Sequence, residues 1–287
     1  MRKKYLSVLL ILSTLFSLLT GCNNKSIEAI YGQELVKCGA IYDTDSKLSY
    51  ELPIICEGEI KDFSVEEYYV DGEGQYEISF EKLEGGYKYK GLYYYLAYFN
   101  VGVEKENPAK ITIESVDMKI NGKLFTYDME DMHFSNIKGT YGDEFIPTQG
   151  ALLYGNGGPA VVINKIPEEK YVVEFLVEED CVIREIAYHD YLDISDIEVS
   201  VNGVETKYNN NIVLKKGDNV MFKYYLKYKE GVFKYDIVKT TLLVKYSIAD
   251  NKYIFSDEQG LVIINLRDSS FIKDYIDEKL GGKWYEK

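Results

Sequence analysis

Hydrophobic and polar residues alternate along most of the chain after residue 30. The clearest example is residues 220–228, VMFKYYLKY, where the even-numbered positions are all apolar or aromatic and lysines occupy two of the odd ones. Alternation with one buried face is typical of a strand in an antiparallel sheet. Residues 242–248 predict a further strand. Residues 87–103 are apolar on both faces, as expected for a strand in the centre of a sandwich.

Only one segment has the spacing of a helix. Ser269 and Ser270 could cap it, and Gly281-Gly282 would end it. Its apolar face would be formed by Phe271, Ile272, Tyr275, Ile276 and Leu280. The chain is therefore predicted to be mostly β with a short C-terminal helix.

A weak internal repeat suggests how the strands are grouped. Residues 116–128, VDMKINGKLFTYD, align without gaps with residues 197–209, IEVSVNGVETKYN. Each segment has an Asn-Gly pair between alternating apolar residues, which is the strongest short signal for a β-hairpin. Residues 170–177 also align with residues 219–226. The two offsets, 81 and 49 residues, differ by 32 residues, so the first copy would contain an insertion.

These matches predict two related immunoglobulin-like β-sandwich domains. The first would span residues 31–178, with the insertion at residues 129–160, and the second would span residues 179–287 with the C-terminal helix. The spacing of strands and turns suits such a sandwich, although the buried Trp and paired Cys of antibody-type domains are absent.

The insertion is the strongest candidate for a ligand-binding site. Connections longer than about 15 residues in compact domains are usually functional or disordered, and this one is too apolar for a plain linker. The alternative is that it supplies extra strands to one sheet. The candidate binding residues are His133, Phe134, Tyr141, Asp143, Glu144 and Tyr154.

The sequence predicts no catalytic residue, no metal site and no cofactor. His133 and Asp131 offer two possible ligands where a zinc site needs at least three, and His189 is expected in the other domain. Residues 155–160 fit a dinucleotide-binding pattern formally, but a strand and not a helix is predicted to follow. A pair of carboxylates acting in glycoside hydrolysis remains an alternative, because the chain holds 47 acidic residues.

Two further residue types invite a functional interpretation. Tyrosines, 28 in all, offer flat contact area for sugars or peptides, although their β propensity explains most of them. Several lysines of the second domain are expected on one sheet face, where they would meet an anionic wall polymer or lipid headgroups, or would be an ordinary solvated face. These are Lys223, Lys227, Lys229, Lys234, Lys239 and Lys245.

The charge of the chain limits its partners. The net charge is −14, and it becomes −17 without residues 1–21, which carry three basic residues and no acidic ones. Nucleic acid is therefore an improbable partner, because its phosphates require Lys and Arg. Cys38 and Cys56 could form a disulfide, or they could be buried free thiols together with Cys181.

The first 22 residues indicate where the protein acts. Met1 to Lys4 are positively charged, residues 5–19 are uncharged and mostly apolar, and Leu19-Thr20-Gly21-Cys22 follows. This stretch resembles the lipobox of bacterial lipoproteins. The resemblance implies that residues 1–21 are a signal peptide, that Cys22 carries a diacylglyceryl group with acyl chains such as palmitate, and that residues 22–30 form a tether.

Together these features predict a lipid-anchored protein on the outer face of the cell membrane. Its expected function is non-catalytic binding of a peptide, a protein or a cell-envelope polymer. A carboxylate-dependent surface hydrolase and an accessory subunit of a membrane transport or secretion complex are the alternatives. A membrane contact through the N-terminal lipid is the one partner that the sequence specifies.

Overall fold

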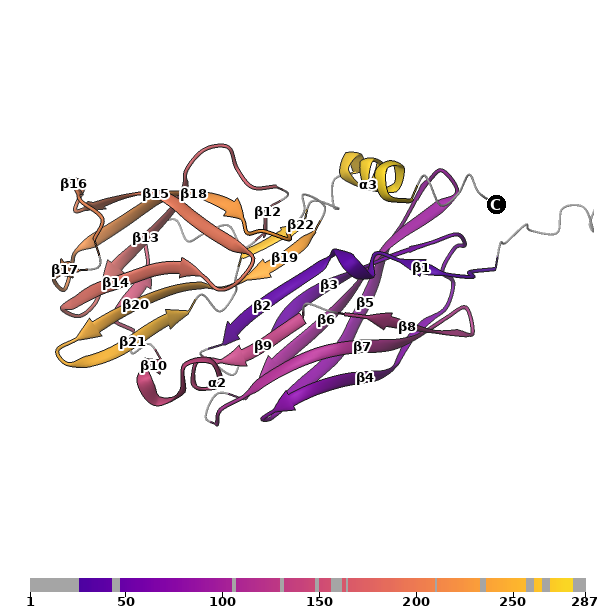
Figure 1. The fold of residues 1–287 in the computed structure, drawn as a ribbon, viewed down its shortest axis with the longest axis horizontal. Helices are drawn as coiled ribbons and strands as arrows, with labels where there is room; N and C mark the ends of the chain where they lie inside the picture. The colour runs from indigo at the N-terminus through magenta and orange to yellow at the C-terminus, as the bar shows by residue number, and fades with distance from the viewer. Residues whose placement is uncertain are drawn as a thin grey trace, which may run out of the picture.

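The computed structural model describes residues 26–42, 47–104, 107–129, 132–147, 150–155, 162–163, 165–209, 211–232, 236–256, 261–264 and 269–280. These residues are mostly β, as predicted, and they form two lobes along the long axis of the molecule (Figure 1). Cys22 lies outside the described residues, so the lipidation prediction stays a prediction.

Lobe 1 consists of two sheets packed face to face. Its core lies between them and includes Leu52, Ile54 and Phe99 of sheet A and Ile111 and Met118 of sheet B. Sheet A contains, in spatial order, β1 (Ile30–Tyr31), β3 (Lys47–Cys56), β6 (Leu92–Val103) and β5 (Tyr76–Tyr89). The lobe 1 part of sheet B contains β2 (Val36–Tyr42), β9 (Met132–Asn136), β7 (Lys110–Ile120) and β4 (Phe63–Glu73), and β8 (Lys123–Asp128) also pairs with β7.

Lobe 2 repeats this arrangement with sheets C and D. Val173, Phe175 and Phe222 of sheet D pack with Ile183 and Val244 of sheet C in its core. Sheet C contains β10 (Ile146–Pro147), β21 (Asn251–Ser256), β20 (Leu242–Ile248), β14 (Cys181–Tyr188) and β17 (Ile212–Leu214). Sheet D contains β11 (Leu152–Tyr154), β13 (Tyr171–Val177), β18 (Asn219–Tyr228), β15 (Leu192–Val201) and β16 (Val204–Thr206).

Sheet B continues from lobe 1 into lobe 2. Beyond β2 it adds β19 (Ile237–Thr240), β22 (Leu261–Ile264) and β12 (Val162–Ile163), and β19 pairs with β2 in parallel. Val238 of β19 packs in the core of lobe 2. The next residue, Lys239, points the opposite way into lobe 1, where its Nζ donates a hydrogen bond to the Ser49 carbonyl at 2.6 Å and lies 4.2 Å from the Tyr50 ring centroid. The lobes are therefore joined by a shared sheet.

A small buried cluster completes the junction between the lobes. Ile41 of β2 packs with Ile137, Leu243 and Ile254 and is fully buried. Its N–H donates to Thr241 Oγ1 at 3.0 Å. The short helical segments are η1 (Gln33–Leu35), α2 (Ile137–Tyr141) and η2 (Gly142–Glu144).

The predicted domain boundary at residue 178 is wrong. Strand β13, at Tyr171–Val177, pairs with β18 of lobe 2, and Val173, Phe175 and Val177 are buried in the lobe 2 core. The segment 129–160 is also not an appendage to one sandwich. It supplies β9 to sheet B, β10 to sheet C and β11 to sheet D, which is the alternative of extra strands. Its buried apolar residues Met132, Phe134 and Leu152 lie in these strands.

The two Asn-Gly hairpins of the repeat are confirmed, but the second match is not a repeat. Asn121 and Asn202 both have left-handed backbones, with φ of 50° and 53°, at the β7–β8 and β15–β16 turns. In contrast, residues 171–176 and 219–224 are antiparallel neighbours in sheet D. They resemble each other because both strands alternate over the same core.

The C-terminal helix is confirmed, but it packs on lobe 1 and not on the second domain. It forms α3 (Ser269–Tyr275) and continues as a π-helical turn, η4 (Ile276–Leu280). Ile272 and Ile276 pack with Ile55, Leu92 and Leu96 on the outer face of sheet A. The continuous strand predicted over residues 87–103 is interrupted, because Lys90-Gly91 turns the chain from β5 into β6.

The predicted lysine face does not form. Lys223 and Lys227 are exposed on sheet D, Lys245 is on sheet C, and Lys239 is buried between the lobes. Lys234 lies outside the described residues. Of the alternatives for the cysteines, the structure shows free, buried thiols at Cys38, Cys56 and Cys181.

Candidate functional site

A row of small and polar side chains crosses sheet B where the lobes meet. Thr112 of β7 pairs with His133 of β9, His133 with Gly39 of β2, and Gly39 with Thr240 of β19. Directly paired residues on neighbouring strands point to the same face of a sheet. Phe134, next to His133, points into the lobe 1 core, so this row lies on the opposite face of sheet B.

Gly39 makes room in this row for a turn from lobe 2. The turn from β14 to β15, His189-Asp190-Tyr191, lies directly over it. A Cβ at position 39 would lie 2.8 Å from Asp190 Oδ2 and 3.0 Å from Asp190 Cβ, closer than packed atoms allow. The absence of a side chain at this position therefore permits the contact between the lobes.

The same turn has an unfavourable backbone. Asp190 and Tyr191 both have left-handed conformations, with φ of 54° and 51°. Turns of this kind favour Asn-Gly or Asp-Gly, and a left-handed non-glycine residue costs about 1–2 kcal/mol. The neighbouring strand holds the turn in place: the His189 N–H donates to the Thr241 carbonyl at 2.9 Å, and Thr240 Oγ1 donates to the Asp190 carbonyl at 3.2 Å.

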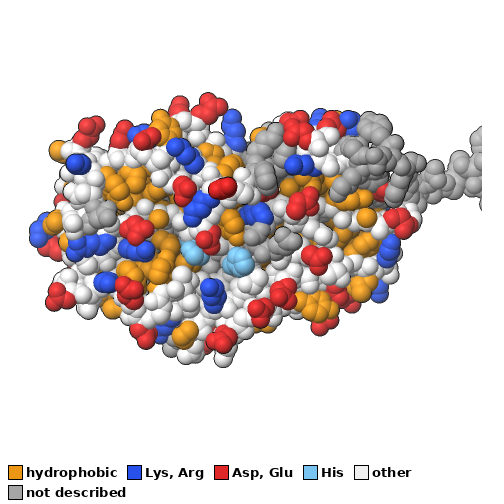
Figure 2. All heavy atoms as spheres, in the orientation of Figure 1, with side chains coloured by type: hydrophobic (Ala, Val, Ile, Leu, Met, Phe, Trp, Pro, Cys, Tyr) orange, Lys and Arg blue, Asp and Glu red, His pale blue; other side chains and the backbone are white. Residues whose placement is uncertain are grey.

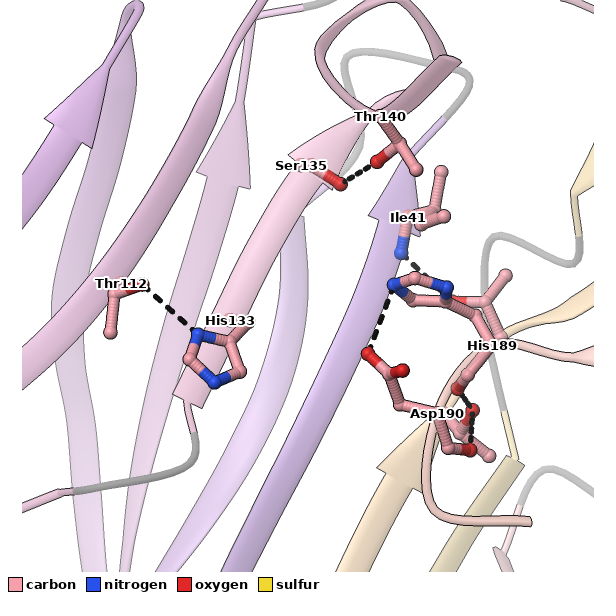
Figure 3. A network of polar contacts seen from close by, with 9 residues as sticks. Ile41, Thr112, His133, Ser135, Thr140, His189 and Asp190 are labelled. Atoms are coloured by element: carbon pink, nitrogen blue, oxygen red, sulfur yellow. Dashed lines mark hydrogen bonds and ion pairs between the residues drawn. The ribbon is translucent and has the colours of Figure 1, made fainter.

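The two histidines of the chain both lie at this junction. Figure 2 shows them on the same face of the molecule, between the lobes, and Figure 3 shows their polar contacts. His133 Nδ1 and Thr112 Oγ1 form a hydrogen bond of 3.0 Å, and His189 Nε2 lies 3.2 Å from Asp190 Oδ2. We refer to His133, His189, Asp190 and Thr112 as the junction cluster.

The surroundings of His189 keep its imidazole neutral near pH 7. Burial has the largest effect and lowers the pKa of His189, while the neighbouring Asp190 carboxylate raises it. The positive charges of Lys229 and Lys110, and His133 itself, lower it further. A neutral imidazole offers one hydrogen-bond donor and one acceptor. The junction cluster thus combines hydrogen-bonding side chains with nearby lysines on a chain that is otherwise strongly acidic.

The structure divides the predicted binding residues among different environments. His133 belongs to the junction cluster. Phe134 is 1% exposed and packs edge-on against Tyr50 in the lobe 1 core, so it offers no surface to a ligand. Tyr154 packs against Phe175 and Phe255 in lobe 2, with ring centroids 5.2 Å apart in both pairs.

Tyr141, Asp143 and Glu144 lie on α2 and η2, which cover sheet C. Glu144 forms a 2.8 Å ion pair with Lys252, and the hydrogen bond from this lysine lowers the pKa of Glu144. Lys245 lies 5.4 Å from the Tyr141 ring centroid. Burial raises the pKa of the Tyr141 hydroxyl, and the charge of Lys245 partly opposes this effect. These residues attach the segment to lobe 2.

Sequence reasoning did not select His189, Asp190 or Gly39 as site residues, and it expected His189 in a separate domain. One signal was available, because Tyr-His-Asp-Tyr-Leu connects two alternating segments without the glycine that a tight hairpin normally requires. Nothing in the sequence indicated that this turn lies over Gly39, which is separated from it by about 150 residues.

Among the described residues, no three His, Cys, Asp or Glu side chains come close enough together to bind an ion. None of the helices in the same residues is long and apolar enough to cross a membrane.

Comparisons with known proteins give little further information. No protein-family model and no curated protein sequence matches the chain. The N-terminal periplasmic domain of ScsB from Proteus mirabilis aligns with 76% of this chain and 91% of its own length, at 9% identity and a TM-score of 0.24. The secreted serine protease VesC from Vibrio cholerae aligns with 69% of this chain and 52% of its own length, at 11% identity and a TM-score of 0.17. A beta-glycosidase from Bacteroides vulgatus aligns with 77% of this chain and 25% of its own length, at 13% identity and a TM-score of 0.25. These similarities are too low to transfer a function to this chain.

Proposed function

We propose that the protein is a lipid-anchored surface protein that binds a peptide, a protein or a cell-envelope polymer at the junction cluster, without catalysis. One observation carries the proposal: two histidines from different lobes lie on one face, beside a turn held in an unfavourable conformation. Such conformations cluster at binding sites and active sites, because the surrounding structure must be built to hold them.

The construction of the junction suits binding by preformed groups. The shared sheet and the buried cluster around Ile41 fix the lobes, so a ligand would meet a surface that is already ordered. Preorganised groups bind with a smaller entropic cost. Lys110 and Lys229 give the surroundings of His189 a positive character, so we propose a ligand that carries carboxylate or phosphate groups.

The location and the finer fold class are part of the same proposal. The lipobox-like residues Leu19 to Cys22 support export and acylation, and the face-to-face sheets of each lobe support an immunoglobulin-like sandwich in the broad sense. The parallel pairs of β2 with β19 and with β9 are additions to that antiparallel pattern.

Binding can be tested by cosedimentation with cell-envelope fragments from the producing bacterium. The fragments are used intact and after removal of their anionic polymers by acid. We expect His133→Ala and His189→Ala to weaken retention on intact fragments, and Lys223→Ala, a charge change on sheet D, to leave it unchanged. Equal retention of all four proteins would contradict the proposed site, and loss of retention by Lys223→Ala alone would move the site to sheet D.

Location is tested separately with Cys22→Ser. This variant should leave the membrane fraction or accumulate as an uncleaved precursor, while the wild-type protein should carry the mass of a lipid on Cys22. A wild-type protein without lipid would overturn the location without affecting the binding site.

A further inference from the structure

The N-terminal end of the described chain is fixed to lobe 1. Ile27 is 5% exposed and belongs to the lobe 1 core, and β1 pairs with β3 shortly afterwards. Lys123 of β8 donates to the Ile27 carbonyl at 3.3 Å and forms an ion pair of 3.3 Å with Glu28. From Ile27 onward the chain is therefore part of the body of the protein, so the predicted tether over residues 22–30 is wrong for residues 27–30.

Only four residues lie between Cys22 and Ile27, so five Cα–Cα steps join them. A fully extended chain spans at most about 3.6 Å per residue, so the Cα atoms of these two residues lie within about 18 Å of each other. The headgroup layer on each side of a bilayer is itself about 5–8 Å thick. If Cys22 carries a lipid, as the proposed function assumes, this end of lobe 1 is held against the membrane surface.

The surface at this end is formed by two connected turns. In the β7–β8 hairpin, Asn121 Oδ1 accepts hydrogen bonds from the N–H groups of Lys61 and Asp62 at 2.8 and 3.1 Å, and its Nδ2 donates to the Glu59 carbonyl at 2.7 Å. Leu124 of this hairpin is 57% exposed. Three exposed lysines, Lys61, Lys119 and Lys123, lie in these turns together with three exposed acidic residues, Glu28, Glu59 and Asp62.

The exposed Leu124 and the short reach from Cys22 fit a lipid headgroup layer, and the lysines of these turns can contact its phosphates. Lysines near a membrane surface are attracted to headgroup phosphates, and an adjacent leucine can enter the interface. The other Asn-Gly hairpin, β15–β16, lies at the opposite end of the long axis (Figure 1). In the alignment of the two hairpins, Leu124 corresponds to Glu205, which is exposed.

We infer that the β7–β8 hairpin of lobe 1 rests on the lipid headgroups, with Leu124 at the interface, and that lobe 2 points away from the membrane. This orientation places the junction cluster between the membrane and the outer tip of the protein. It rests on acylation of Cys22, which is the location part of the proposed function.

The free cysteines allow a direct test. Burial raises the pKa of Cys38 and Cys56 to about 12 and that of Cys181 to about 11, so all three react poorly with thiol reagents near neutral pH. Leu124→Cys and Glu205→Cys introduce one exposed thiol each, at corresponding positions of the two hairpins. Each is labelled with a fluorophore, and the acylated protein is reconstituted into phosphatidylcholine–phosphatidylglycerol vesicles with and without a spin-labelled headgroup.

We expect quenching at residue 124 to be severalfold stronger than at residue 205, where it should match that of labelled protein without a lipid anchor. Equal quenching at both positions, or stronger quenching at residue 205, would overturn the orientation. Mass spectrometry of Cys22 in the same preparation separates this outcome from failure of the anchor itself. If Leu124→Cys fails to fold, Thr126→Cys places the label at another exposed position on the same strand.

Discussion

The two Asn-Gly hairpins show how similar local sequences are built into different surroundings. The N–H of Asn121 donates to the Asp62 carbonyl at 2.9 Å, just before β4, and the N–H of Asn202 donates to the Asn219 carbonyl at 2.8 Å, at the start of β18. Yet β4 comes before the β7–β8 hairpin in the chain, whereas β18 comes after the β15–β16 hairpin. The hairpin and its contact with a neighbouring strand are thus a local unit, while the path of the chain through each lobe is determined elsewhere.

Deleting segment 129–160, which follows the β7–β8 hairpin, is expected to have the largest effect and tests how the chain path differs between the lobes. Among the described residues of lobe 2, the β15–β16 hairpin is followed by no strand equivalent to β9. In lobe 1, a deletion that joins Asp128 to Val161 would remove β9, β10 and β11. Five large buried apolar residues, Met129, Met132, Phe134, Ile137 and Leu152, would be lost at about 1.5–3 kcal/mol each. Since domains are typically stable by only about 5–15 kcal/mol, we expect no cooperative thermal transition for this deletion.

A matched pair of point variants sharpens this prediction. Leu152 is 1% exposed and the adjacent Leu153 is 46% exposed. Leu152→Ala should cost about 2–5 kcal/mol in urea unfolding, whereas Leu153→Ser should change stability by less than about 0.5 kcal/mol. A folded deletion variant with wild-type melting, or equal effects at the two leucines, would mean that the segment is not part of the core.

The two hairpin asparagines should differ in their contribution to stability. Asn121→Ala loses three side-chain hydrogen bonds and places alanine in a left-handed conformation, so we expect a cost of about 2–4 kcal/mol. Asn202→Ala loses two, its acceptance from the Asn219 N–H and its donation to Asp218 Oδ1, and should cost about 1–3 kcal/mol. Urea unfolding measures both values.

The glycine variants separate the backbone from the side chain. Asn121→Gly and Asn202→Gly remove the hydrogen bonds but accept a positive φ, so each should be less destabilising than its alanine counterpart. If Asn202→Ala proved more costly than Asn121→Ala, the side-chain contacts of the hairpins would not determine their stability.

Gly39 tests the contact between the lobes. In Gly39→Val the new side chain would collide with Asp190. Overpacking of this kind costs about 1–3 kcal/mol, and we expect it to appear as a lower urea midpoint with an unchanged slope. Addition of Asp190→Ala should restore part of this loss if the collision is with that side chain. Equal destabilisation in the single and double variants would place the strain elsewhere.

The smallest expected effect is the pH dependence contributed by His189. Its pKa is lowered in the folded protein, so the unfolded chain binds the proton more readily. The stability contributed by the neutral imidazole is therefore present above the ordinary histidine pKa of about 6.5, and it is lost as the pH falls below that value.

Unfolding free energies measured between about pH 5.5 and 7.5 should consequently fall less steeply with acidification in His189→Asn than in the wild type, because asparagine binds no proton. Carboxylates such as Glu144 remain ionised in that range and add no slope of their own. Identical slopes in the two proteins would show that His189 titrates normally in the fold.

The sequence could predict which residues form several of the strands, but not which strands pair with one another. Alternation over residues 220–228 located β18, and the capping serines located α3, because both signals are local. Alternation also made β13 resemble β18, since two strands over one core share the same pattern of apolar positions. The pattern alone cannot distinguish a neighbour from a repeated copy.

The candidate site shows the same limit. His133 could be selected from the sequence, because it lies in a long segment that the second copy lacks. His189 was placed in a separate domain, although Gly39 of β2 brings its turn close to sheet B. Tertiary contacts between residues 39, 133 and 190 depend on the pairing of β2 with β9 and β19, which no local pattern encodes.

The parallel pairing of β2 with β19 also determines how the molecule resists pulling. The chain enters β2 from the N-terminal end, and it leaves β19 toward lobe 2 at the C-terminal end of that strand, through Thr241. Tension between these two points would pull the strands past one another lengthwise. The four register pairs from Val36–Ile237 to Gly39–Thr240 would then bear the load together, instead of opening one after another as in a zipper.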